Sequence, residues 1–194
     1  MTELSCAREE TPSSAAVSAD GDHSFVDGAA EAMHQFRSAM SELVAGVAAI
    51  TVSEDGMARG MLATSISSYS DRPPSILVSL AHTSRTRDPL LRTDTFGVHL
   101  LGREQTDVAV ALAGSSDDKF TTLSWGWDRG VPQLHSALGY LRCRRSASFE
   151  HHDHTIVIGD VEFVEIGASA PMVYFRRTLD WHLEQASPQR LRRT

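Results

Sequence analysis

Cysteine is scarce in this chain, and the motifs that are built from it are missing. Cys6 and Cys143 are the two cysteines, and no CxxC motif or zinc-ligand spacing surrounds either of them. The sequence therefore gives no support for a disulfide framework or a structural zinc. We expect reduced thiols and a cytoplasmic location.

Positive charge and long apolar runs are also in short supply. Eighteen Lys and Arg stand against 25 Asp and Glu, which gives a formal net charge of −7. Such a chain repels a phosphate backbone, so nucleic acid is not an expected partner. No stretch approaches the run of about 18 apolar residues that a membrane-spanning helix needs, so no membrane crossing is expected.

The common nucleotide-binding and nucleophile motifs are absent as well. There is no GxGxxG sequence, no Walker-type loop, and no Ser-His-Asp or Cys-His arrangement. A nucleotide would have to bind by another route, and nucleophilic catalysis has no support.

The 194 residues suit one domain with a sizeable core. Residues 1–22 contain almost no large apolar side chains, so we expect a disordered tail over residues 1–26. Residues 27–183 form the predicted domain, and residues 184–194 form a basic C-terminal tail.

Apolar periodicity predicts many strands and few helices. Helices are expected over residues 28–45, 88–91 and 104–113, with Asp88 as the N-cap of the second helix and Pro89 at its first position. Strand-like runs occupy residues 46–52, 58–67, 75–81, 95–101, 137–149, 154–166 and 172–175, with a bulge at Gly159–Asp160 and a loop over 114–134. Without a regular βαβ rhythm, this order predicts a mainly β protein, an antiparallel barrel or sandwich with two or three helices.

Two segments have the composition of a ligand wall. The run from Gly60 to Pro74 is rich in small and hydroxyl residues that let a planar ligand approach the backbone, although a plain Ser/Thr-rich strand and turn has the same composition. Ser84, Arg85 and Thr86 precede a predicted helix N-terminus, where a phosphate is favoured, and a solvated surface turn is the alternative.

A third segment, residues 114–120, places Lys119 and Phe120 shortly before Trp125 and Trp127. Lys119 can pair with a phosphate, and aromatic rings can cover a planar ligand. The tryptophans fit a core or an interface equally well.

The run His151-His152-Asp153-His154 resembles a metal cluster only at first sight. His151 and His152 are neighbours that we expect to point apart, and no Cys or Glu joins them at ligand spacing, so no metal is predicted. His154 facing a pocket is the better functional hypothesis, with a structural histidine as the alternative.

Taken in order, these segments resemble the flavin reductase family with the FMN-binding split-barrel fold, the small components of two-component flavin-dependent monooxygenases. The resemblance covers about 140 residues, from Phe36 to Arg176. The matching segments are Phe36–Met40 with Gly46-Val47, Gly60–Pro74, Ser84–Leu101, Ala113–Phe120, His152–Val161 and Val173–Arg176. Departures are Thr64 where the family has Asn, Ile66 where it has Phe, and one extra residue between Thr86 and Pro89.

The resemblance implies an NAD(P)H:flavin oxidoreductase with a Greek-key split barrel, which passes a hydride from NADH or NADPH to FAD or FMN. It implies a homodimer that supplies diffusible reduced flavin to a partner monooxygenase. It also implies site residues, with His154 and Tyr174 on the nicotinamide side. The implied flavin-binding residues are Thr64, Ser65, Ile66, Ser67, Ser84, Arg85, Thr86, Lys119, Phe120 and Tyr174.

Two alternatives keep the fold and change the function. One is a flavoprotein that holds FMN tightly and acts on its own organic substrate, and the other is a flavin or haem carrier without turnover. The choices between FAD and FMN and between NADH and NADPH stay open, because Arg142, Arg144 and Arg145 fit a 2′-phosphate or a solvated strand edge equally well.

Overall fold

The N-terminal helix α1 (Ala29–Ser41) spans the boundary between two units of the chain, which divides between Arg37 and Ser38. The computed structural model describes residues 28–116 and 118–179. No residue of α1 is buried. The helix was predicted to run to residue 45, which is wrong, because Ala45 and Gly46 form a short strand, β1, that pairs with β11 (Val173–Phe175). The predicted tails, residues 1–26 and 184–194, lie outside the described residues.

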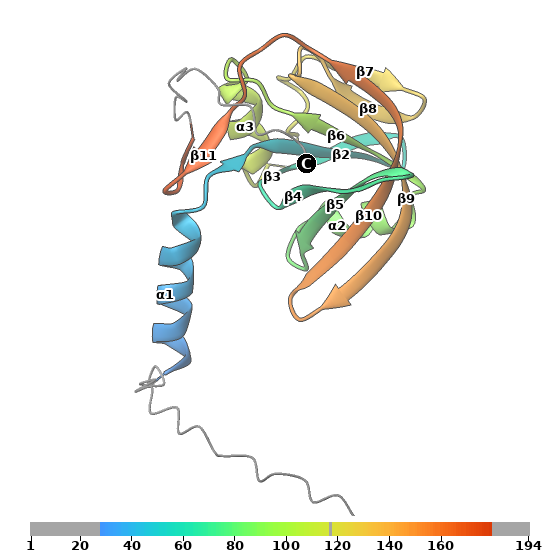
Figure 1. Ribbon diagram of the computed structural model, residues 1–194. Helices are drawn as coiled ribbons and strands as arrows, with labels where there is room; N and C mark the ends of the chain where they lie inside the picture. The colour runs from blue at the N-terminus through green and yellow to red at the C-terminus, as the bar shows by residue number, and fades with distance from the viewer. Residues whose placement is uncertain (1–27, 117, 180–194) are drawn as a thin grey trace, which may run out of the picture. The chain divides into compact units, whose positions relative to one another are not determined.

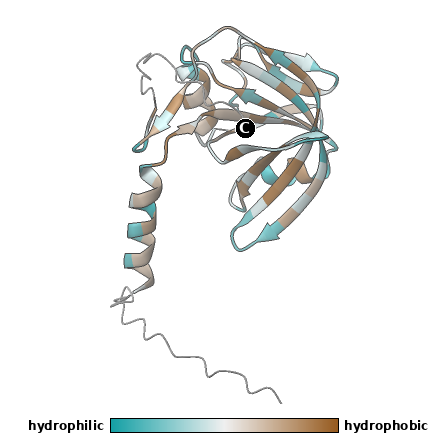
Figure 2. Cartoon of the chain, viewed as in Figure 1, coloured by the Kyte–Doolittle hydropathy of each residue, from teal (hydrophilic) through white to brown (hydrophobic). Residues whose placement is uncertain are grey.

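The second unit is built on a seven-stranded antiparallel sheet with the strand order β3-β2-β6-β9-β10-β5-β4 (Figure 1). Its strands are β2 (Ala48–Glu54), β3 (Met57–Ala63), β4 (Ile66–Asp71), β5 (Pro74–Ala81), β6 (Thr95–Leu100), β9 (Gly139–His151) and β10 (His154–Ile166). Bands of apolar and polar residues alternate along the strands, as expected for a sheet with one buried face (Figure 2). The strands β3 and β4 follow one another in the chain and form the two edges of the sheet.

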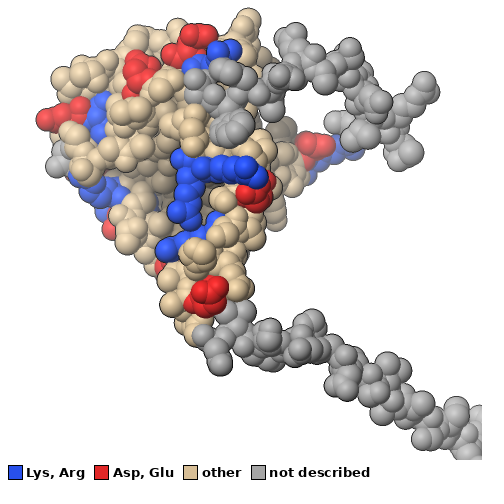
Figure 3. All heavy atoms as spheres, turned by 90° about the vertical axis from the view of Figure 1, so that its left-hand side faces the viewer, with Lys and Arg blue, Asp and Glu red and all other residues tan. Residues whose placement is uncertain are grey.

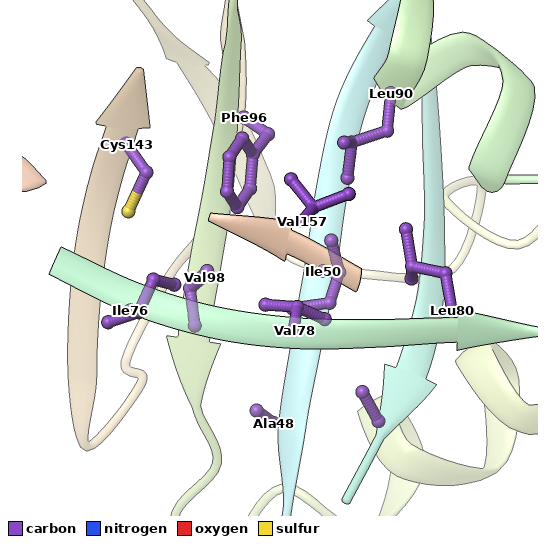
Figure 4. Packing of buried hydrophobic residues seen from close by; sticks show 11 residues of the cluster. Ala48, Ile50, Ile76, Val78, Leu80, Leu90, Phe96, Val98, Cys143 and Val157 are labelled. Atoms are coloured by element: carbon purple, nitrogen blue, oxygen red, sulfur yellow. The ribbon is translucent and has the colours of Figure 1, made fainter. Parts of the chain in front are cut away.

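The sheet curls around one apolar core. Ala63 of β3 and Ile76 and Val78 of β5 belong to the same buried cluster, although their strands lie at opposite ends of the sheet order. Helix α2 (Arg87–Arg92) adds Leu90, and Phe96 of β6 packs beside them (Figure 4). The sheet is therefore a barrel that is split between β3 and β4, which confirms the predicted fold class.

A second buried cluster lies on the other face of β2, so this strand is buried on both faces. Val47 and Ala49 pack there against Val108, Ala109 and Leu112 of helix α3 (Thr106–Ala113). Phe120 and Met172 complete the contact. The remaining strands are β7 (Trp125–Asp128), β8 (Val131–Leu134) and β12 (Thr178–Leu179).

Two local predictions need correction and one is confirmed. Residues 125–134 form the β7–β8 hairpin and not a loop. Thr86, not Asp88, is the N-cap of α2, so Asp88 lies inside the helix. The register of β10 shifts between Ile158 and Gly159, which confirms the predicted bulge.

Within the described ranges, no helix is long and apolar enough to cross a bilayer.

Candidate functional site

A cavity of about 810 Å³ lies against β3, the edge strand of the barrel. Its walls come from β3, from residues 83–86 before α2, from residues 112–116 at the end of α3 together with Lys119 and Phe120, and from the C-terminal segment through Tyr174, Arg177 and Leu179. Lys and Arg side chains gather beside a hollowed part of one face of the molecule (Figure 3). The cavity thus joins segments that are far apart in the sequence.

Gly60 lets β3 pack closely against the side chains of Phe120 and Leu112 beside the cavity. A Cβ atom on Gly60 would lie 3.0 Å from Cζ of Phe120 and 3.1 Å from the carbonyl oxygen of Ile50. The Nζ of Lys119 donates to the carbonyl oxygen of Leu112 at 2.8 Å and to that of Gly60 at 3.4 Å. These contacts hold the ammonium group of Lys119 at the open edge of the strand.

The segment before α2 is tied to the cavity by Ser84 and Arg85. The hydroxyl of Ser84 lies 3.1 Å from the sulfur of Met61 on β3 and accepts a hydrogen bond from the backbone N–H of Thr86 at 3.3 Å. The guanidinium of Arg85 donates to the carbonyl oxygens of Ser115 and Ser116, the latter at 3.2 Å. Arg85 therefore links the segments on either side of the cavity and presents positive charge there.

Part of the cavity wall is apolar and aromatic. Phe120, Leu112 and Leu179 line the cavity together with Tyr174. The indole N–H of Trp125 donates to the carbonyl oxygen of Phe120 at 3.0 Å, and the two rings meet edge to face with their centroids 5.3 Å apart. These two contacts with Trp125 hold the Phe120 ring in place.

The cavity fits a phosphorylated planar ligand such as flavin. Its lining combines cations and hydroxyls with apolar and aromatic side chains. Ser84, Arg85, Thr86 and Lys119 can hold the phosphate, and the apolar wall can cover the ring.

Most of the predicted ligand residues meet at this cavity. The structure brings together Thr64, Ser84, Arg85, Thr86, Lys119, Phe120 and Tyr174. Ser65 and Ser67 do not line it, and the hydroxyl of Ser65 donates to the carbonyl oxygen of Ser79 at 2.7 Å. Ile66 packs against the barrel core and lines a second, apolar cavity of about 360 Å³.

His154 does not line the large cavity of its own chain. It begins β10 at the end of the β9–β10 hairpin, where its Nδ1 lies 2.8 Å from a carboxylate oxygen of Asp153. That hydrogen bond lowers the pKa of Asp153. The role of His154 toward nicotinamide stays a prediction.

The other histidines of this hairpin behave differently from the prediction. The rings of His151 and His152 do not point apart but lie with their centroids 3.9 Å apart, because His152 takes a positive φ of 50° in the turn. Across the described residues, no group of three or more His, Cys, Asp or Glu is arranged to hold a metal ion.

The three arginines of β9 are held by other parts of the protein and do not line the cavity. Arg142 pairs with Asp128, and Arg144 pairs with Asp160 at 3.0 Å. The Nε of Arg145 donates to the carbonyl oxygen of Thr93 at 3.1 Å.

Sequence reasoning missed three charged residues of the cavity wall, which are Glu54, Arg59 and Arg177. Glu54 and Arg59 flank the turn between β2 and β3. A charged pair beside a turn is typical of a solvated hairpin end, so the sequence carries no signal that this pair faces a cavity.

The comparisons with known proteins agree with the architecture. The model of the flavin reductase like domain matches residues 40–182. This chain belongs to that family. It is 34% identical over 146 residues to an NADH:FMN oxidoreductase of Rhodococcus erythropolis, which covers 72% of this chain and 76% of the relative.

Two further relatives extend the agreement. An FMN reductase (NADH) of Pseudomonas syringae is 34% identical over 158 residues, with 79% of this chain and 88% of the relative covered. An NADH:FAD oxidoreductase of Streptomyces globisporus, solved in complex with NAD and FAD fragments, superposes with a TM-score of 0.75 at 28% identity. That match covers 81% of this chain and 96% of the solved one.

Proposed function

We propose that this protein is an NADH-dependent flavin reductase that passes reduced flavin to a separate monooxygenase. The observation that carries the proposal is the cavity beside β3, where Lys119 and Arg85 lie together with apolar and aromatic side chains in a chain of the flavin reductase family. Relatives named NADH:FMN oxidoreductase and the reductase component of a nitrophenol monooxygenase support both halves of it.

The residues of the cavity act by binding and orientation. Arg85 and Lys119 neutralise the phosphate, and the hydroxyls of Ser84 and Thr86 are placed to donate to its oxygens. Phe120, Leu112 and Leu179 exclude water from one side of the cavity. When bound, the flavin supplies the ring nitrogen that accepts the hydride from the nicotinamide.

Hydride transfer needs two aligned rings more than it needs an acid or a base. The wall of the cavity agrees with this requirement, because among the described residues Glu54 is the carboxylate that lines it, and Glu54 is held between two arginines. Positioning of the rings by the cavity wall is therefore the contribution of the protein to the rate.

The decisive experiment is NADH oxidation by purified protein under anaerobic conditions, with FMN and FAD titrated separately after the flavin content has been measured. We expect turnover that depends on added flavin and little flavin in the purified protein. Tight stoichiometric flavin with turnover of another substrate would favour the flavoprotein alternative. Flavin or haem binding without oxidation of NADH or NADPH would favour the carrier.

The protein acts as a homodimer in this proposal. Phe149, Phe163, Val164 and Ile166 on β9 and β10 expose 42–81% of their surface, so several large apolar side chains are left uncovered in a single chain. A second copy that covers them would also explain why His154 stands outside the cavity of its own chain. Sedimentation velocity tests this, and the variant Ile166→Lys should shift the protein toward monomer.

A cytoplasmic location completes the proposal, because the reaction draws on the nicotinamide pool of the cell. Fractionation of the producing cells tests it, with activity expected in the soluble fraction.

A further inference from the structure

A charged cluster occupies the part of the cavity wall near the start of β3. Arg59 precedes Thr64 by five residues, which is about 17 Å of extended strand. Arg59 and Glu54 both line the cavity, and Arg92 of α2 stands behind them. The site described above assigns no ligand contact to these three residues.

Glu54 holds two guanidinium groups with its two oxygens. Its Oε2 accepts from Nε of Arg59 at 2.9 Å, and its Oε1 accepts from Nη2 of Arg92 at 2.6 Å. The side chains of Arg59 and Glu54 are 29% and 24% exposed, whereas that of Arg92 is 62% exposed. Glu54 is thus fixed from two sides, and it orients Arg59 at the wall through Nε.

Arg59 extends the anion-binding wall beyond Ser84. Successive side chains of a strand alternate between its faces, so Arg59 and Met61 share a face of β3. Met61 contacts the hydroxyl of Ser84, at 3.1 Å, and Arg59 lies two residues farther, about 7 Å along the strand. A ligand with one phosphate at Ser84 and Arg85 would therefore extend a second phosphate toward Arg59.

We propose that Arg59, positioned by Glu54 and Arg92, binds the second phosphate of a dinucleotide in this cavity. The inference rests on the proposed function, because it assumes that the first phosphate belongs to a flavin or a nicotinamide nucleotide. Both FAD and NADH carry this second phosphate in their adenylate half. FMN and reduced nicotinamide mononucleotide have no second phosphate.

The test compares each dinucleotide with its mononucleotide. Calorimetry gives the dissociation constants of FMN and FAD, and steady-state kinetics give KM for NADH and for reduced nicotinamide mononucleotide, in the parent protein and in Arg59→Ala. A lost charge-assisted contact weakens binding by about tenfold. We expect that loss for FAD relative to FMN if flavin is the source, or for NADH relative to its mononucleotide if nicotinamide is.

Two further variants test the positioning role. Glu54→Gln keeps the size of the side chain but loosens the hold on Arg59, so the preference for the dinucleotide should fall severalfold. Arg59→Lys keeps the charge and should recover part of the preference. Arg144→Ala is the matched control, because this arginine also pairs with acidic side chains but lies outside the cavity, and it should leave the preference unchanged.

Equal effects of Arg59→Ala on mononucleotides and dinucleotides, or no effect on either, would overturn the inference. That outcome is distinct from failure of the proposed function, in which the parent protein binds no flavin at all.

Discussion

His99 accepts a hydrogen bond at Nε2 from the backbone N–H of Leu134 at 3.0 Å, which ties β6 to β8 inside the protein. The ring is fully buried and stacks on Tyr140 with the ring centroids 4.8 Å apart. Burial lowers the pKa of His99 to about 4. Nε2 must stay unprotonated to accept, so the native state holds a neutral imidazole.

This buried histidine predicts a loss of stability in mild acid. Between pH 6.5 and about 4 the unfolded chain binds a proton at His99 that the native state does not, so the free energy of unfolding falls as the pH falls. The loss at pH 5 relative to pH 7 is about 2 kcal/mol. Urea unfolding at both pH values measures it.

The matched variant is His99→Gln, whose amide can still accept from Leu134 but does not titrate. Its pH dependence should be smaller by that amount, even if its stability at pH 7 is lower. An identical pH dependence in the two proteins would show that other groups cause the acid sensitivity.

Gly60 is predicted to tolerate no side chain. In Gly60→Ala, the new Cβ would press on Phe120 and on the carbonyl of Ile50, at 3.0 and 3.1 Å. Overpacking of this kind costs about 1–3 kcal/mol, and displacement of Phe120 and Lys119 should weaken flavin binding as well. Thermal unfolding and flavin titration measure the two effects. The control is Gly46→Ala, where a Cβ would meet nothing within 4 Å and both quantities should stay close to those of the parent protein.

Asp128 should be a major contributor to stability and a minor one to catalysis. It accepts hydrogen bonds from Arg142, whose side chain is 9% exposed, and from the hydroxyl of Tyr140 at 3.0 Å. Asp128→Asn leaves the Arg142 charge poorly compensated, and removal of one partner from a buried pair costs about 3–5 kcal/mol. We expect a loss of free energy of unfolding near the lower end of this range, because the carboxylate of Glu162 lies 3.9 Å from Arg142 and still compensates part of its charge.

Chemical denaturation of Asp128→Asn, Tyr140→Phe and the double variant separates the two bonds. Tyr140→Phe should cost only about 1 kcal/mol. NADH oxidation by the folded variants should match that of the parent protein, and a selective loss of activity would contradict the structural role.

His154 should affect the reaction with NADH more than the binding of flavin. In His154→Ala we expect a lower kcat/KM for NADH with an unchanged dissociation constant for FMN, because the ring stands outside the flavin cavity of its own chain. His151→Ala, on the same hairpin, should change neither. A loss of flavin affinity in His154→Ala would instead assign the ring to the flavin site.

The sequence predicted elements that depend on local pattern better than those that depend on partners. The α3 stripe of Val108, Ala109 and Leu112 is buried as its helical spacing indicated. The β7–β8 hairpin was missed because Pro132 and Gly130 usually mark loops. Here Arg129 and Gly130 form the turn with positive φ values of 49° and 84°, and the carbonyl of Pro132 accepts from the hydroxyl of Thr51 at 2.6 Å.

The same distinction between local pattern and distant partners applies to the residues of the candidate site. Lys119 and Arg85 could be placed from motifs, because each lies within a contiguous segment that resembles the family. Arg59 could not, because its place depends on the approach of the segments 83–86 and 112–120 to β3. Long-range closure of a barrel brings such residues together and leaves no local periodicity.

The position of the cavity at a sheet edge has a consequence for the handling of the protein. An uncovered strand edge is a template for pairing with a strand of another molecule, which is a common start of aggregation. The strand β3 is such an edge, and whatever fills the cavity shields part of it. We expect flavin-depleted protein to scatter more light on storage than flavin-saturated protein, so the cofactor would also act as a chaperone for the open side of the barrel.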